Sequence, residues 1–251
     1  MSRKYMFMVI AALGFLTSCS LFPKKEKKLV FVLFDVSDST MEKTRRDAYA
    51  KEFDEKILSS LVGGDLVIGD KITDNPLAQS SFPINFNIQA YSLLGDETER
   101  TELNQSERVR ISTTVVNLLE SNGRRIMQTK ILDSLKLAER VFASYPEYQN
   151  KILVIFSDMI EESDSYNFNR MNLTQNTSAE IVSVQKKQNT LPDLKGVKIY
   201  ISGATASSAG GLDSNKINSV KTFWINYFLA CGASLSPNNY GPVIIRFEGG
   251  R

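Results

Sequence analysis

Short apolar runs recur along the chain, separated by longer segments in which apolar and polar residues follow a helical period. Residues 29–34 read Leu-Val-Phe-Val-Leu-Phe, which is typical of a strand buried on both faces of a parallel sheet. Similar runs predict strands at residues 65–72, 86–94, 151–157, 197–202 and 243–247. Amphipathic patterns predict helices at residues 41–61, 97–120, 130–143, 178–188 and 214–232. This alternation indicates an α/β fold with a parallel sheet.

One pair of predicted strands has no helix between its members. Residues 65–94 leave no room for a crossover helix, so one strand of the pair is expected to run antiparallel at an edge of the sheet. Residues 73–85, with Pro76 and Pro83, would form the connecting loop. No internal repeat or linker interrupts the pattern, which predicts one domain over residues 29–251.

The last predicted helix carries a stripe of large or apolar side chains. Ile217, Val220, Trp224, Tyr227 and Cys231 are spaced by three or four residues and therefore share one face. Such a stripe can be an aromatic ligand box, but packing against a sheet is its commoner use. We expect core packing, with Cys231 as a small buried apolar residue.

The beginning of the chain has the pattern of an export signal. Arg3 and Lys4 precede an apolar run at residues 5–16, too short to cross the roughly 30 Å of hydrocarbon in a bilayer. The following Leu-Thr-Ser-Cys, ending at Cys19, resembles the lipobox of bacterial lipoproteins. The resemblance implies that residues 1–18 are a signal peptide and that Cys19 carries lipid. An ordinary secretory signal with an incidental cysteine is the alternative.

Residues 19–28 would then form a lipidated tether that contains Pro23 and the charged run Lys-Lys-Glu-Lys-Lys. The run could attract anionic lipid or serve only as a solvated spacer. Lipidation places the protein at a membrane of the bacterial cell envelope. An Asp directly after the lipidated cysteine would resemble an inner-membrane retention signal, but this position is Ser20. We therefore expect the protein to be anchored in the outer membrane, facing the periplasm or the cell surface.

Composition argues against several classes of function. The chain has no histidine, which removes the usual general base, the Ser-His-Asp triad and the commonest zinc ligand. Its 30 Lys and Arg nearly balance 28 Asp and Glu, so nothing suggests a nucleic-acid partner. Cys231 is the only other cysteine, so acylation of Cys19 would leave no intrachain disulfide. An apolar content of 42% is sufficient for a core.

Oxygen-bearing side chains gather where predicted strands end. The first strand runs into Asp35, Ser37 and Ser39, which alternate in an irregular turn and can therefore converge. The fourth strand runs into Asp158, and Thr129 lies at the start of the helix before that strand. Open α/β sheets bind ligands at the carboxyl ends of their strands, and such oxygens suit a hard cation. A magnesium-like ion prefers about six oxygens, so this set needs further ligands.

The ordered set resembles the von Willebrand factor A family and its metal-ion-dependent adhesion site. In that family Asp35, Ser37 and Ser39 would match the first metal loop, Thr129 the second and Asp158 the third. The resemblance covers nearly all of the mature chain. It implies a doubly wound, mostly parallel sheet with one antiparallel edge strand, helices on both faces, and a bound Mg²⁺, Mn²⁺ or Ca²⁺. Water or an acidic group from a partner would complete the metal shell.

Two positions depart from the family pattern. The second loop reads Met127-Gln128-Thr129, without the frequent glycine before the threonine. Met159 follows Asp158 where glycine is common. Both departures concern the shape of the loops rather than the identity of the ligands.

Simpler roles are open for the same residues. Asp and Ser in turns often only bond nearby amides, and Thr129 could be a helix N-cap. A phosphotransferase of the haloacid dehalogenase type would need a second Asp where Ser37 stands. Glu161, Glu162 and Asp164 could form a second cation site, an acidic rim or a solvated loop.

These features together predict a non-enzymatic, lipid-anchored binding module. Its metal would bind a carboxylate of a partner protein or surface polymer. Two alternatives belong to other classes: a hydrolase that acts on envelope material through a metal-activated water, and a structural protein without bound metal.

Overall fold

The structure, a computed structural model, describes residues 26–37, 42–90, 97–120, 128–204 and 214–248. Its strands form one sheet in the order β3-β2-β1-β4-β5-β6, in which β3 is antiparallel to β2 and every other pair is parallel. The strands are β1 (Lys28–Asp35), β2 (Leu66–Ile72), β3 (Ile84–Asn87), β4 (Asn150–Phe156), β5 (Lys198–Ser202) and β6 (Tyr240–Gly241). This mixed sheet with one antiparallel edge strand confirms the predicted fold class.

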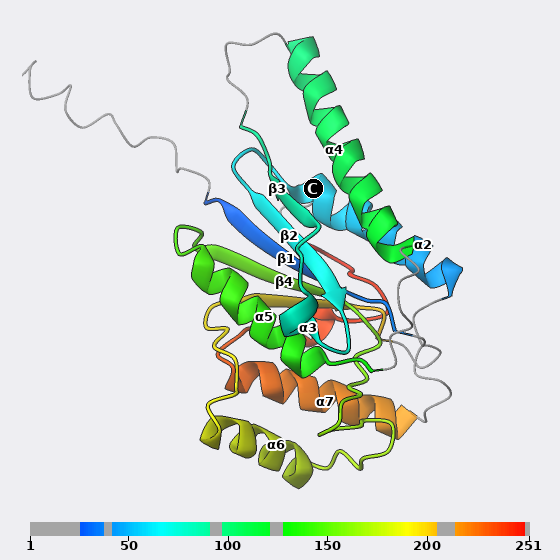
Figure 1. Ribbon diagram of the computed structural model, residues 1–251, viewed down its shortest axis with the longest axis vertical. Coiled ribbons are helices and arrows are strands. Elements are labelled where there is room, and N and C mark those ends of the chain that lie inside the picture. The colour runs from blue at the N-terminus through cyan, green and yellow to red at the C-terminus, as the bar shows by residue number, and fades with distance from the viewer. Residues whose placement is uncertain (1–25, 38–41, 91–96, 121–127, 205–213, 249–251) are drawn as a thin grey trace, which may run out of the picture.

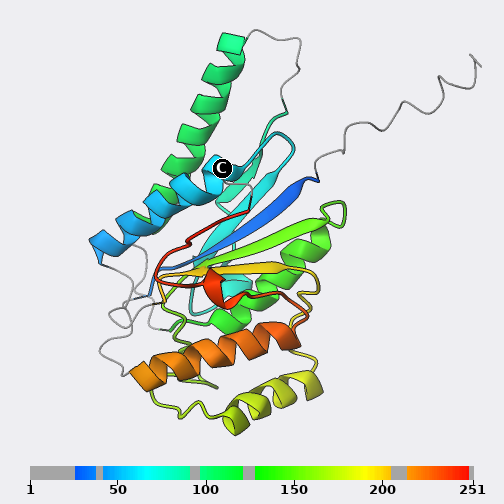
Figure 2. The same ribbon diagram turned by 180° about the vertical axis from the view of Figure 1, so that it is seen from behind.

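Helices cover both faces of the sheet (Figures 1 and 2). One face packs against α2 and α4, the other against α5 and α7, and α6 lies outside α7. The helices are α2 (Lys43–Glu52), α3 (Pro76–Gln79), α4 (Glu97–Glu120), α5 (Ile131–Ser144), α6 (Gln175–Lys187) and α7 (Ser214–Ala230). In the ranges that the structure describes, no helix combines the length and apolar character that a membrane span needs.

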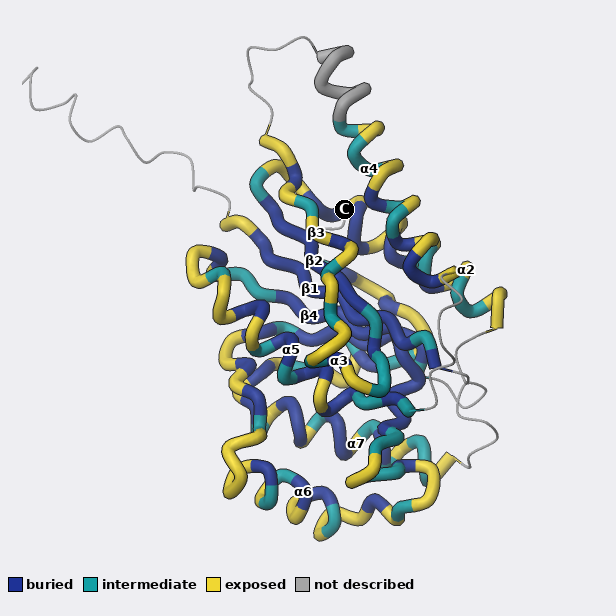
Figure 3. Tube along the Cα trace, viewed as in Figure 1, coloured by how far each residue is buried: buried dark blue, intermediate teal, exposed yellow. Residues whose placement is uncertain are grey.

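The central strand β1 is buried on both sides. Leu29, Phe31 and Leu33 belong to the core under α5 and α7, whereas the intervening residues up to Phe34 belong to the core under α2 and α4. Figure 3 shows the resulting continuous buried centre, with exposed positions on the outer helices. An all-apolar strand is stable here because both of its faces are removed from water.

Two predicted elements were approximately right but differ in detail. The pair at residues 65–94 does place an antiparallel strand at the sheet edge, but β3 covers Ile84–Asn87 and shares only two residues with the predicted strand at 86–94. The predicted loop contains the short helix α3, and residues 91–94 lie outside the described residues. The segment at residues 41–61 is helical in three parts: α2, a π-helical turn at Phe53–Ile57 and a 3₁₀ turn at Leu58–Ser60. Its first residue, Met41, lies outside the described residues.

The strand predicted at residues 243–247 is wrong. The last strand is the two-residue β6, which pairs with β5. Pro242 lacks an N–H that could continue the ladder, and the Ile244 N–H donates to the carboxylate of Glu52 on α2. Apolar alternation in this segment, with Ile244 buried and Ile245 exposed, arises from packing over the core rather than from strand pairing.

The stripe on α7 and the following Cys231 is core, as expected, except that Ile217 is only half-buried. Val220, Trp224, Tyr227 and Cys231 are each at most 4% exposed. The Tyr227 hydroxyl donates to Gln185 of α6, and the Trp224 indole N–H donates at 2.8 Å to the carbonyl of Met159. The core tryptophan therefore also supports the turn that follows β4.

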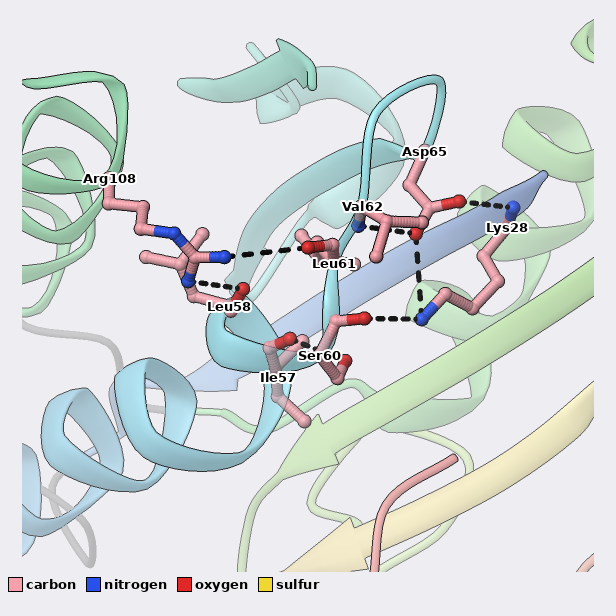
Figure 4. A network of polar contacts seen from close by, with 8 residues as sticks. All are labelled: Lys28, Ile57, Leu58, Ser60, Leu61, Val62, Asp65 and Arg108. Carbon is pink, nitrogen blue, oxygen red and sulfur yellow. Dashed lines mark hydrogen bonds and ion pairs between the residues drawn. The ribbon is translucent and has the colours of Figure 1, made fainter. Parts of the chain in front are cut away.

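A buried polar network joins the beginnings of β1 and β2 (Figure 4). Lys28 begins β1, one residue before the predicted strand, and its ammonium lies 3.5 Å from the Asp65 carboxylate while donating to the carbonyl of Ser60. Asp65 also accepts the Lys28 and Val62 N–H groups. Arg108 of α4 donates to carbonyls in the same bend. Lys28 is therefore a structural residue rather than part of a solvated tether.

Replacing Trp224 with Ala should lower the free energy of unfolding by about 3 to 5 kcal/mol, because it empties a fully buried site and removes a bond to Met159. Denaturant unfolding would measure the change. Leu229→Ala on the same helix is the control, since Leu229 is 71% exposed and its truncation should be nearly neutral. Equal stability of the two variants would show that the Trp224 face contributes little to the core.

Candidate metal centre

Asp35 is the last residue of β1, and its side chain is fully buried. Its Oδ1 accepts the Ser37 N–H at 2.9 Å, and its Oδ2 accepts the Ser157 hydroxyl at 2.7 Å. Burial raises the pKa of Asp35, while hydrogen bonds from Ser37 and Ser157 and the positive charge of Arg45 act in the opposite direction. A cation beside this carboxylate would favour its ionised form.

The first metal loop is only partly described. Ser37 is 5% exposed and lies directly beside Asp35. Ser39, which the resemblance adds to this loop, and the intervening Asp38 lie outside the described residues.

Asp158 lies two residues beyond the end of β4 and is 5% exposed. Its Oδ1 accepts the Ile160 N–H at 3.0 Å, and the Ser157 hydroxyl oxygen accepts the Met159 N–H. Met159 has φ +65°, the left-handed conformation that glycine adopts most easily, and its side chain is buried. The departure from glycine therefore does not prevent the positive φ. The Trp224 bond to the Met159 carbonyl helps to hold it.

Thr129 is buried beside this turn but is not the N-cap of α5. The N-cap position is occupied by Lys130, which makes no side-chain cap bond. The Thr129 carbonyl accepts the Glu162 N–H at 3.0 Å, so the segment before α5 pairs with the segment after Asp158. The capping alternative for Thr129 is therefore wrong.

The structure thus brings together the three loops that contain the predicted residues. The Asp35–Ser157 bond joins the first loop to the third, and the Thr129–Glu162 bond joins the second to the third. Carboxylate and hydroxyl oxygens fit a hard cation such as Mg²⁺ or Ca²⁺, and the roughly four lone pairs of a carboxylate allow hydrogen bonding and ligation together. Among the described residues, no group of three acidic or cysteine side chains could hold a metal.

The acidic run after Asp158 does not act as a unit. Glu161 is buried and accepts the Leu132 N–H at 3.0 Å, which satisfies an amide in the first turn of α5. Glu162 accepts a bond from Asn169, and Asp164 accepts one from Gln128. The three carboxylates have separate protein partners and do not gather into a second cation site.

Sequence reasoning missed Ser157 and Tyr49. Ser157 holds Asp35, and its position between β4 and Asp158 was an available signal. Tyr49 is a buried residue of α2, and burial followed by the charges of Asp35 and Asp158 raises its pKa. Nothing in the local pattern of the helix distinguishes Tyr49 from other core residues.

No family model and no curated protein matches this chain. Solved structures do match. They include a von Willebrand factor type A protein from Catenulispora acidiphila, with TM-score 0.43 and 13% identity over 82% of this chain and 43% of that one. They also include the pilus adhesin SpaC from Lactobacillus rhamnosus GG, with TM-score 0.39 and 11% identity over 80% of this chain and 31% of that one. The chain spans less than half the length of either protein.

Glu161→Gln should flatten the pH dependence of stability. Burial raises the pKa of Glu161 from 4.5 to about 7. Between pH 4.5 and about 7, Glu161 is largely deprotonated in the unfolded chain but still protonated in the folded protein. The free energy of unfolding therefore falls as the pH rises through this range and levels off above about 7. Glutamine removes this loss, on the order of 3 kcal/mol, and its side-chain oxygen can still accept the Leu132 N–H.

Denaturant unfolding between pH 5 and 8 would measure this effect. Glu162→Gln is the matched control, because its carboxylate lies outside the core and accepts a bond from the exposed Asn169 side chain. A Glu161→Gln profile that superimposes on that of the parent would contradict the prediction.

Proposed function

We propose that this protein is a lipid-anchored, extracytoplasmic binding module. It would hold Mg²⁺, Mn²⁺ or Ca²⁺ between oxygens of Asp35, Ser37, Ser39, Thr129 and Asp158 and present the ion to an acidic group of a protein or surface polymer. The observation that carries the proposal is the convergence of three loops, whose described residues bring buried carboxylates and hydroxyls to the carboxyl edge of the sheet.

The surroundings of Asp35 favour a bound cation. The Ser37 amide and the Ser157 hydroxyl, which donate to its oxygens, are neutral groups, and the positive charge of Arg45 also favours its ionised form. Burial of Asp35 and of the neighbouring Asp158 makes further compensation of their negative charges favourable. A cation supplies that compensation and, where its shell is incomplete, an open position at which a partner carboxylate can replace water. The chain's residues would therefore bind and orient the ion without covalent chemistry.

The direction of β1 gives the anchor a simple geometry. The proposed anchor, Cys19, precedes β1, whereas Asp35 ends it, so tether and site belong to opposite edges of the sheet. The eight residues between Cys19 and Lys28 allow a separation of at most about 30 Å. A domain tethered in this way can turn the Asp35 edge away from the membrane and towards a partner.

Asp35→Asn is expected to abolish metal binding while the metal-free protein remains folded. The asparagine keeps the size of the side chain and an oxygen for the Ser37 N–H, but it removes the buried charge. A metal at about ten times its dissociation constant stabilises a protein by roughly 1.4 kcal/mol, so the parent should melt about 3 to 6 °C higher with magnesium than with chelator. The variant should show no difference.

Three further variants make the metal test specific. Ser37→Ala and Thr129→Ala remove neutral ligands and should weaken the response without erasing it. Asp164→Asn is the control for non-specific attraction, because its carboxylate is exposed and bonds Gln128 and Lys130. If Mg²⁺, Mn²⁺ and Ca²⁺ leave the melting temperature of the parent unchanged and calorimetry detects no binding, the metal-free structural alternative holds. Metal-dependent hydrolysis of a phosphoester or peptide would favour the enzyme alternative.

Cys19→Ser should release the protein from the membrane fraction. Each buried methylene of an acyl chain contributes about 0.8 kcal/mol of membrane affinity, and serine cannot carry the thioether-linked lipid. Partition between detergent and aqueous phases would measure the loss. Cys231→Ala, which changes the buried cysteine just after α7, should partition as the parent does. A processed Cys19→Ser protein that still enters the detergent phase would overturn the anchor.

A further inference from the structure

The hydroxyl of Tyr49 is a buried polar group without an evident structural task. The residue is 3% exposed, and its ring packs against Phe156 with the ring centroids 5.2 Å apart. In the described part of the chain, its hydroxyl has no hydrogen-bond partner. A buried hydroxyl is normally bonded, because leaving it unpaired incurs its desolvation penalty. Phenylalanine would fill the same space without this penalty.

The position of the hydroxyl points to the candidate metal centre. Gly203, just after β5, has φ +97°, and a Cβ added there would collide with the Tyr49 hydroxyl and approach the Ser157 carbonyl to 3.0 Å. The hydroxyl therefore lies beside the turn that contains Ser157 and Asp158. It occupies space that is open because Gly203 has no side chain. The influence of the Asp35 and Asp158 charges on Tyr49 agrees with this placement.

The missing partner of the hydroxyl is an acceptor. Both oxygens of Asp35 already accept bonds, from the Ser37 amide and from Ser157. A phenol that remains protonated beside two carboxylates is suited to donate to an additional oxygen. Such an oxygen is what an incomplete metal shell would bring, either as water or as the acidic group of a partner.

We propose that Tyr49 is a further binding residue of this centre, whose hydroxyl donates to the oxygen that completes the metal shell. The inference rests on the proposed function, since it requires a metal between Asp35 and Asp158. Tyr49 and Gly203 also line a groove of about 710 Å³ between α2 and residues 242–245.

Tyr49→Phe tests the proposal, with Mn²⁺ alone as the probe. Titration of the purified protein, with free Mn²⁺ followed by electron paramagnetic resonance, should give a dissociation constant about 3- to 10-fold higher than that of the parent, the loss expected for one hydrogen bond. The melting temperature in chelator should be equal or higher, because an unpaired buried hydroxyl is removed. Mn²⁺ should also change the near-ultraviolet tyrosine spectrum of the parent, but not that of Tyr49→Phe.

Tyr148→Phe is the matched control, since Tyr148 is buried near the start of β4, at the opposite edge of the sheet, and its change should leave Mn²⁺ affinity unaltered. If the parent binds Mn²⁺ and Tyr49→Phe binds it equally well, the role of Tyr49 is wrong and the proposed function stands. A lower melting temperature of Tyr49→Phe in chelator would show that the hydroxyl has a structural partner, which also overturns the role. If neither the parent nor any variant binds metal, the proposed function itself fails.

Discussion

Strand β1 lies between β2 and β4 in the sheet, and helices cover both of its faces. It therefore meets polar groups only at its two ends. No side chain from Leu29 to Phe34 is exposed to solvent. Charged groups cannot be placed inside such a strand without a large desolvation penalty. The chain therefore changes abruptly from apolar to ionisable at Lys28 and at Asp35, and these two positions organise the opposite edges of the sheet.

The two edges neutralise their buried carboxylates differently. Asp65 at the amino edge accepts two amides and faces the Lys28 ammonium, which itself donates to a carbonyl. This network is closed and has a structural role (Figure 4). Asp35 at the carboxyl edge is bonded by a neutral amide and a neutral hydroxyl. A second buried carboxylate, Asp158, lies in the adjoining turn, and this concentration of negative charge at one edge is the physical basis of the proposed cation site.

The candidate centre also depends on the core beneath it. Trp224 packs in the aromatic cluster of α7 and donates to Met159, the residue that adopts a positive φ directly after Asp158. Glu161 bonds the first turn of α5 and thereby joins that turn to the segment after Asp158. Packing of α5 and α7 against the sheet thus determines where the third loop lies. A loop held in this way is suited to a ligand that demands defined oxygen positions.

The sequence by itself determined the elements whose signal is local. The two-sided burial of residues 29–34 followed from the absence of polar residues, and the antiparallel edge followed from the short spacing between β2 and β3. It also indicated which residues follow the carboxyl ends of the strands. The tertiary structure decided the rest. The Asp35–Ser157 bond spans 122 positions of the chain, and the side chain of Glu161, rather than that of Thr129, bonds the first turn of α5. Glu52 bonds the segment that apolar alternation assigned to a strand. These outcomes could not be predicted because each depends on a hydrogen bond between a polar side chain and a backbone or hydroxyl group distant in sequence. Such a bond does not change the pattern of apolar and polar residues around either partner.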